Sequence, residues 1–165
     1  VLTLVANNRT WVYDIHNKIW MEWAGTDGNR FPIYMYEKYS NTTIAQHETN
    51  GKIYTMSPYI YQDDSVNFTV MARLNRQDLD TNDWKFVKSL ELIGDKQTST
   101  TPVLVQYSDD DYQTLSTART FDMSDYNPYG TNFGRFRRRA WQVSYTGNGP
   151  LRLEALQLKY RLGTD

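Results

Sequence analysis

Residues 135–162 read RFRRRAWQVSYTGNGPLRLEALQLKYRL, and this stretch decides the fold class. Apolar and polar side chains largely alternate in residues 136–146 and again in residues 151–162, which is the period of a β-strand. The segment Gly147-Asn148-Gly149-Pro150 separates the two runs with residues typical of turns. Leu, Glu, Ala and Lys in the second run favour a helix, but the alternation and the preceding turn predict a strand with a hairpin partner.

Short alternating runs also make up the rest of the chain, and Asn, Asp, Gly and Pro bound them. Helical periodicity is nearly absent, so we predict an all-β protein. Asn50-Gly51 is the strongest short hairpin signal. The predicted strands are 2–6, 10–15, 19–23, 33–36, 42–47, 52–57, 68–73, 86–93, 102–107, 119–123, 136–146 and 151–162.

Two regions differ in texture, and we place their junction at Asp63-Asp64-Ser65. Residues 1–62 repeat an aliphatic strand, a polar turn and an aromatic strand with a period of about 40 residues, from Thr3 to Thr43, which is near the length of a β-propeller blade. Two copies cannot close a propeller, and the chain starts with Val, so we expect a fragment completed by other blades. Residues 63–165 have the length of a β-sandwich. The predicted architecture is therefore partial propeller-like blades followed by an antiparallel β-sandwich.

Composition excludes several functional classes. The 165 residues contain no cysteine, so disulfides, thiolate metal sites and cysteine nucleophiles are absent, and two histidines leave little for zinc or triad chemistry. No apolar run is long enough for a membrane-spanning helix, and no signal peptide is recognisable. Charge is uneven, because residues 1–118 hold ten Lys/Arg and fifteen Asp/Glu whereas residues 119–165 hold eight and four.

The sharpest motif is Arg135-Phe136-Arg137-Arg138-Arg139. In a strand, Arg135, Arg137 and Arg139 share one face, and this row of guanidinium groups predicts phosphate contacts to nucleic acid. Two plainer interpretations stay open. The row is either a solvated outer face, or it pairs with carboxylates of the acidic first part at a subunit interface.

Acidic turns suggest calcium but lack its ligand spacing. Ser108-Asp109-Asp110-Asp111 has no glycine at the required place, and we predict a hairpin turn instead. It is similar to a degraded Asp-box, S-x-D-x-G-x-T-W, which keeps Ser108, Asp110 and Thr114 but has Tyr112 for the glycine. The segment 78–82 also begins like a calcium loop without completing it, so we predict no metal site and no cofactor.

The aromatic residues of the first region allow two interpretations. They are either a sugar-stacking platform or, as we favour, core aromatics and cross-strand pairs of the sheets. Carboxylate pairs such as Glu22/Asp27 and Glu37/Glu48 have no spacing that distinguishes them from surface acids, and we predict no catalytic residues. The aromatic set is Trp11, Trp20, Trp23, Tyr34, Tyr36 and Tyr39.

Four segments carry a resemblance to a known family. They are VLVQYSDDD (103–111), RTFD (119–122), GRFRRRAW (134–141) and LRLEALQL (151–158). In this order, an aliphatic strand with a Ser-Asp-Asp turn, a polar stretch, an Arg-rich strand and a closing strand resemble the C-terminal part of the tail hub and nozzle proteins of short-tailed bacteriophages, among them the packaged-DNA stabilisation proteins. The aromatic strands of residues 10–23 are similar to the propeller blades of these proteins. Tyr112 departs from the family pattern, which has a glycine after the Asp-Asp turn.

The resemblance implies a structural virion component of the tail rather than an enzyme. Copies of the chain would form a ring below the portal, contact other tail or portal proteins, extend the DNA channel, retain packaged DNA and conduct it during ejection. Two alternatives stay open. The wealth of Trp and Tyr fits a carbohydrate- or receptor-binding β module of a phage tail, and the Asp-box similarity fits a fragment of a propeller glycosidase.

Overall fold

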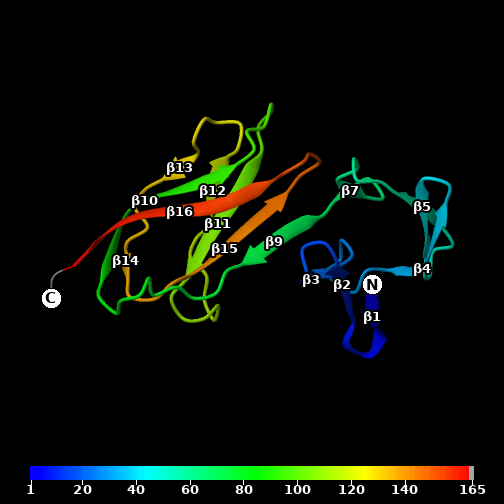
Figure 1. Cartoon of the computed structure of the whole chain (residues 1–165), viewed down its shortest axis with the longest axis horizontal. Helices are drawn as coiled ribbons and strands as arrows, with labels where there is room; N and C mark the ends of the chain where they lie inside the picture. Colours follow the sequence, from blue (N-terminus) through cyan, green and yellow to red (C-terminus); the bar gives the residue numbers. More distant parts are fainter. Residues whose placement is uncertain (164–165) are drawn as a thin grey trace. The chain divides into compact units, whose positions relative to one another are not determined.

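The computed structural model describes residues 1–163, and it is all-β, as predicted. The chain divides into two compact units, Val1–Phe68 and Thr69–Asp165, which are described separately here (Figure 1). The acidic stretch at the predicted junction forms the turn of a small hairpin, and the division follows that hairpin. Within the described residues, no helix has the length and apolar character needed to cross a membrane.

The first unit contains two three-stranded antiparallel sheets, with the orders β1-β2-β3 and β4-β5-β6, and the separate hairpin β7-β8. In both larger sheets, strands that follow one another in sequence are neighbours, so each is a simple meander. The elements are β1 (Leu2–Leu4), a 3₁₀ turn η1 (Val5–Asn7), β2 (Arg9–Asp14), β3 (Ile19–Trp23), β4 (Ile33–Tyr39), β5 (Thr42–His47), β6 (Ile53–Met56), β7 (Gln62–Asp63) and β8 (Val66–Asn67).

Turn chemistry in this unit confirms the hairpin prediction at Asn50-Gly51. The pair lies between β5 and β6, and Gly51 has a φ of 70°, which glycine adopts without steric cost. The repeat of about 40 residues does not give two equivalent sheets. It aligns Thr3 in the outer strand β1 with Thr43 in the middle strand β5, so equivalent sequence positions are not equivalent places in the two sheets.

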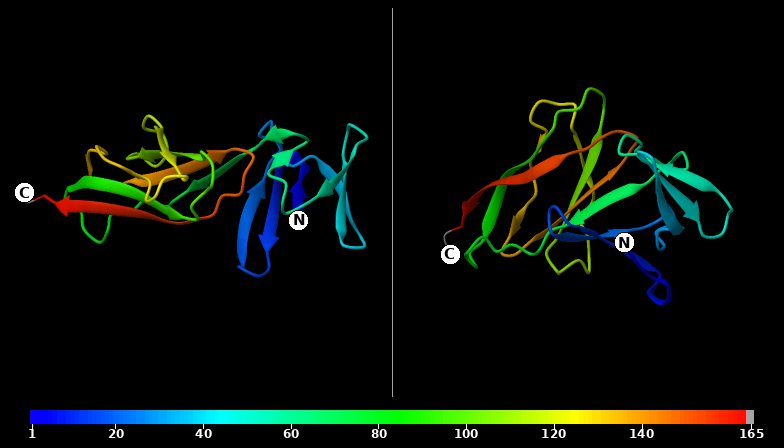
Figure 2. Two further views of the ribbon diagram at one scale, coloured as in Figure 1. Left: turned by 90° about the horizontal axis from the view of Figure 1, so that it is seen from above. Right: turned by 45° about the vertical axis from the view of Figure 1, so that its right-hand side comes forward.

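The second unit is an antiparallel β-sandwich, as its length predicts. One sheet has the order β13-β10-β14 with β16 also paired to β10, and the other has the order β12-β11-β15-β9. Figure 2 shows these two layers from further directions. The strands are β9 (Thr69–Arg73), β10 (Lys85–Gly94), β11 (Pro102–Ser108), β12 (Arg119–Asp122), β13 (Tyr129–Gly130), β14 (Arg135–Phe136), β15 (Ala140–Thr146) and β16 (Leu153–Leu162).

The core of the sandwich lies between its sheets. Strand alternation directs every second side chain inward, so Leu90 and Leu92 of one sheet pack with Val103 and Val105 of the other. Phe133 fills the centre and makes edge contacts with Trp141 and Tyr107, with the Trp141 centroid 5.6 Å away. The buried cluster comprises Leu90, Leu92, Val103, Val105, Phe121, Met123, Phe133, Trp141, Val143 and Tyr145.

The last strand confirms one prediction and corrects another. Residues 153–162 are a strand, but β16 pairs along its length with β10, not with β15 as the preceding turn suggested. The segment 147–150 therefore carries the chain from one sheet to the other. Tyr145 explains this course, because its hydroxyl donates to the Gly149 carbonyl at 3.3 Å and its ring occupies the space where a side chain at Gly147 would lie.

Gly94 provides a test of this closure. It ends β10 at an irregularity in the β10–β16 pairing, where an added Cβ would collide with the Arg152 carbonyl and approach the Leu153 Cα to 3.2 Å. Gly94→Ala should therefore lower the free energy of unfolding by about 1–3 kcal/mol, as overpacking does. Gly149→Ala is the matched control, because its Cβ would meet only the Tyr145 hydroxyl at 3.6 Å. Urea denaturation measures both, and equal effects would contradict the proposed contact.

Candidate nucleic-acid interface

The row of three arginines predicted from the sequence does not form. Strand β14 ends at Phe136 and β15 begins at Ala140, so the strand alternation is interrupted at residues 137–139. Arg135 and Arg137 are exposed, but only 2% of the Arg139 surface is accessible. After this interruption the Arg139 side chain points into the sandwich. Its guanidinium is therefore not available to a phosphate.

Arg139 instead forms an ion pair in which the guanidinium is buried and the carboxylate of Asp109 is 46% exposed. Its Nε and Nη2 donate to the two carboxylate oxygens of Asp109 at 2.7 and 2.8 Å, in a bidentate geometry. Its Nη1 donates to the Phe133 carbonyl at 2.6 Å, and the Tyr107 ring centroid lies 3.7 Å from the guanidinium carbon. A charge so far from water needs such partners, because the cost of removing it from water is large.

Asp109 is held for this pairing by the acidic turn, which confirms the turn prediction. The Ser108 hydroxyl donates to Asp110 at 2.7 Å and accepts the Tyr112 backbone N–H at 2.8 Å, while Asp110 accepts from the Thr114 hydroxyl at 2.6 Å. Hydrogen bonds from Thr114 and Ser108 lower the pKa of Asp110 to about 2. The residues shared with the Asp-box therefore act here as a turn clamp.

Tyr112 replaces the Asp-box glycine and still takes a left-handed conformation, with a φ of 67°. Such a φ is unusual for a bulky residue. Three contacts hold its side chain: the hydroxyl lies 2.7 Å from both the Leu74 and the Trp141 carbonyl, and the Arg73 guanidinium carbon lies 5.0 Å from the ring centroid. The turn thus keeps its shape without the glycine.

Residues 131–137, which we call the arginine segment, are bound through their backbone carbonyls. Three cationic side chains donate hydrogen bonds to these carbonyls. Arg119 donates to the Thr131 and Asn132 carbonyls, the latter at 2.7 Å. Arg139 donates to those of Phe133 and Arg135. Lys85 is fully buried, and its Nζ donates to the carbonyls of Arg137, at 2.9 Å, and Thr81.

Because its carbonyls face these cations, the segment presents its arginine side chains outward. The guanidinium carbons of Arg135 and Arg137 lie 4.6 and 5.1 Å from the Trp84 ring centroid. Arg138 follows and is also exposed. Within residues 1–163, none of these three arginines has a carboxylate at ion-pair distance. Arg139 therefore pairs with a carboxylate inside its own chain, and pairing of the other arginines at a subunit interface stays a prediction.

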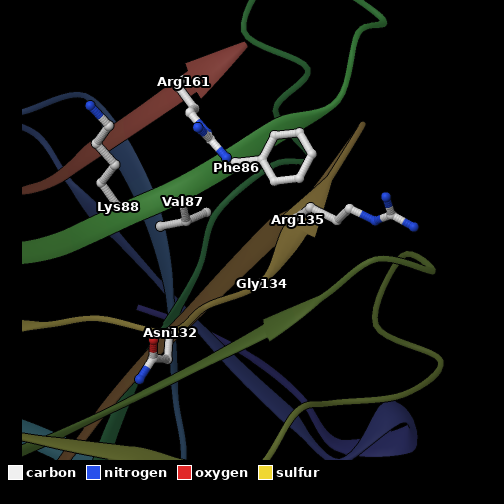
Figure 3. A pocket seen from close by; sticks show the side chains of 7 residues that line it. All are labelled: Phe86, Val87, Lys88, Asn132, Gly134, Arg135 and Arg161. Carbon is white, nitrogen blue, oxygen red and sulfur yellow. The ribbon is translucent and has the colours of Figure 1, made fainter. Parts of the chain in front are cut away.

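Two open hollows flank the arginine segment, and Arg135 lines both. The first has a volume of about 770 Å³. Figure 3 shows Lys88 at one end and Arg135 at the other, with Phe86 and Val87 between them. The second, of about 500 Å³, is lined by Arg76, Asn82, Trp84, Asp109, Arg135, Phe136, Arg137 and Arg138.

The sequence did not point to Trp84, Phe86, Lys88 or Arg161 as site residues. Their proximity depends on strand pairing, since β10 aligns Phe86 opposite both Arg135 of β14 and Arg161 of β16. The alternating run at 151–162 places Arg161 on a strand but gives no indication of its partner.

The other candidate residues have structural roles or stand apart. Glu22 pairs with Arg9 at 2.6 Å, and Glu48 pairs with Arg30 at 2.7 Å. Of the aromatic set, Trp11, Trp23 and Tyr36 are half-buried, whereas Trp20, Tyr34 and Tyr39 are exposed and are not core residues. Trp20 does form a cross-strand pair with Tyr13, as the favoured interpretation allows. Among residues 1–163, no group of three or more acidic or histidine side chains is placed to hold a metal ion.

No family model and no curated protein matches the chain. The resemblance to phage tail proteins therefore stays a prediction that rests on the quoted sequence segments.

The ion pair of Arg139 generates a stability test. Asp109→Asn leaves the buried guanidinium without its counter-charge, and because Asp109 itself is half-exposed we expect the free energy of unfolding to fall by about 1–3 kcal/mol. Asp111→Asn is the control two residues away, because its pair with Arg76 is exposed and should contribute less than about 1 kcal/mol. Both values come from urea denaturation. If the two variants lose similar stability, Asp109 does not stabilise the buried Arg139 guanidinium as proposed.

Proposed function

We propose that the chain is a structural, non-enzymatic subunit of a bacteriophage tail, at the hub or nozzle. In this proposal, copies assemble with one another and with other tail or portal proteins to extend the portal channel, retain packaged DNA and conduct it during ejection. The composition of the candidate site supports binding rather than catalysis. It presents cations and aromatic rings, and the carboxylate among its lining residues, Asp109, is committed to Arg139.

The exposed apolar faces of the first unit carry this proposal. Among residues 1–68 only Thr10 and Ala45 are buried, although both larger sheets are rich in apolar side chains. Three-stranded sheets need a covered apolar face for stability, and exposed apolar patches of this kind mark protein–protein contacts. The exposed large side chains are Val1, Leu2, Leu4, Val5, Tyr13, Ile15, Ile19, Trp20, Tyr34, Met35, Tyr39, Ile53, Tyr59, Ile60, Val66 and Phe68.

The second unit adds an exposed sheet edge. Strand β9 pairs with β15 on one side, and each of its residues is exposed, with more than half of the Val70 and Met71 surfaces accessible. An unpaired edge is a template for another strand, and a closed ring of identical subunits satisfies all such edges without forming fibres.

One observation favours the second candidate, a carbohydrate- or receptor-binding module. Tyr13 and Trp20 lie on adjacent strands with ring centroids 5.0 Å apart, and more than half of the Trp20 surface is exposed. Exposed aromatic rings are suited to stacking against sugars. The assembly experiment below distinguishes the two candidates.

We expect the purified chain, alone or mixed with its tail partners, to form a discrete species heavier than the 19.4 kDa monomer. Ile53→Lys and Val70→Lys place a charge on the exposed sheet and on the exposed edge, and each should shift the mass toward the monomer. Tyr126→Ser is the control, because Tyr126 is 84% exposed but lies outside the strands. Light scattering coupled to gel filtration measures the mass. A strict monomer under all conditions would overturn the proposal, and oligosaccharide binding lost in Trp20→Ala would favour the second candidate.

A further inference from the structure

The two hollows together form one cationic surface on the second unit. Its exposed side chains are Lys88, Arg135, Arg137, Arg138 and Arg161, which we call the basic surface. Within the described residues, none of them is within ion-pair distance of a carboxylate. The carboxylate that lines the second hollow, Asp109, is already paired with Arg139. The positive charge of the basic surface is therefore available to an external anion.

Aromatic rings hold the guanidinium groups of this surface in place. Trp84 contacts those of Arg135 and Arg137, and the Arg161 guanidinium carbon lies 5.2 Å from the Phe86 ring centroid. Such contacts reduce the conformational entropy that these long side chains lose when they bind a ligand. They also occupy the two rings, so Trp84 and Phe86 are not free platforms for stacking bases.

The backbone beneath these arginines is fixed as well. The Gly134 carbonyl accepts the Val87 N–H at 3.1 Å, β14 pairs with β10, and buried Lys85 and Arg139 hold the carbonyls on either side. The positive charges are thus mounted on a rigid support, which favours binding without a large rearrangement.

From these observations we infer that the basic surface binds the phosphate backbone of nucleic acid without reading its sequence. Five cations that are unpaired in the described part of the chain line two hollows that share Arg135, and such a number of positive charges suits a ligand with several phosphates rather than one small anion. Contacts to phosphates alone give no base discrimination and depend strongly on salt. The inference rests on the proposed function for its partner, packaged DNA, and it replaces Arg139 with Lys88, Arg138 and Arg161 as predicted contacts.

The test measures binding of a fluorescein-labelled duplex by anisotropy across a series of salt concentrations. For the whole chain, the logarithm of the association constant should fall linearly with the logarithm of salt concentration, and two duplexes of unrelated sequence should bind equally. Arg135→Gln/Arg137→Gln removes two contacts, so the slope should flatten by about 1.8. Arg152→Gln is the control, since it removes an exposed arginine of the same unit that lies outside both hollows and should leave the slope nearly unchanged.

Three results would contradict the inference. Absence of duplex binding at low salt, or an equal loss in Arg152→Gln, would show that the basic surface is not a phosphate site. Tighter binding of single strands would indicate base stacking instead. The mass of each preparation, measured in parallel, separates this inference from the proposed function. An assembly that does not bind DNA overturns only the inference, and a monomer that binds DNA overturns only the assembly.

Discussion

The second unit depends on the guanidinium of Arg139, which is buried inside the sandwich and balanced by Asp109. A buried charge is stable only when it is paired and hydrogen-bonded, and each of the three guanidinium nitrogens donates to an acceptor in the turn after β11 or in the arginine segment. Lys85, which is fully buried, and Arg119, which is partly exposed, also donate to neighbouring carbonyls of the segment. The segment thus has its carbonyls bound to cations, while the side chains of Arg135 and Arg137 are exposed.

This arrangement explains which features the sequence predicts and which it does not. Period-two alternation identifies the strands, and β16 is recognised although its composition favours a helix. Its partner is not recognised, because pairing with β10 depends on a crossover between the sheets that alternation does not encode. The prediction that Arg135, Arg137 and Arg139 share one face is wrong for a related reason. A strand interruption after Phe136 has no local signal, yet it decides that Arg139 is buried.

The two units differ in how much of their apolar surface is buried, and the proposed function is argued from that difference. The sandwich covers Leu90, Phe133 and Trp141 between two sheets. Each sheet of the first unit is a meander whose apolar side chains are largely exposed, including Trp20 and Ile53. Alternation predicts the strands of both units equally well, but what covers a sheet depends on other sheets and chains. The prediction of core aromatics and cross-strand pairs therefore holds for Trp20 only as a cross-strand pair with Tyr13, and Tyr34 and Tyr39 are exposed.

Hydrogen–deuterium exchange of the whole chain carrying Arg139→Lys tests the central claim most directly, because the variant keeps the charge but loses the bidentate donor geometry. Peptides covering the arginine segment, residues 131–137, and the neighbouring amide of Val87 report on the support of the basic surface, and a peptide covering residues 89–92 reports on the core. We predict that exchange accelerates in the arginine segment and at Val87 while the core peptide keeps its protection. Unchanged exchange in the arginine segment, or a uniform acceleration in both regions, would contradict the account.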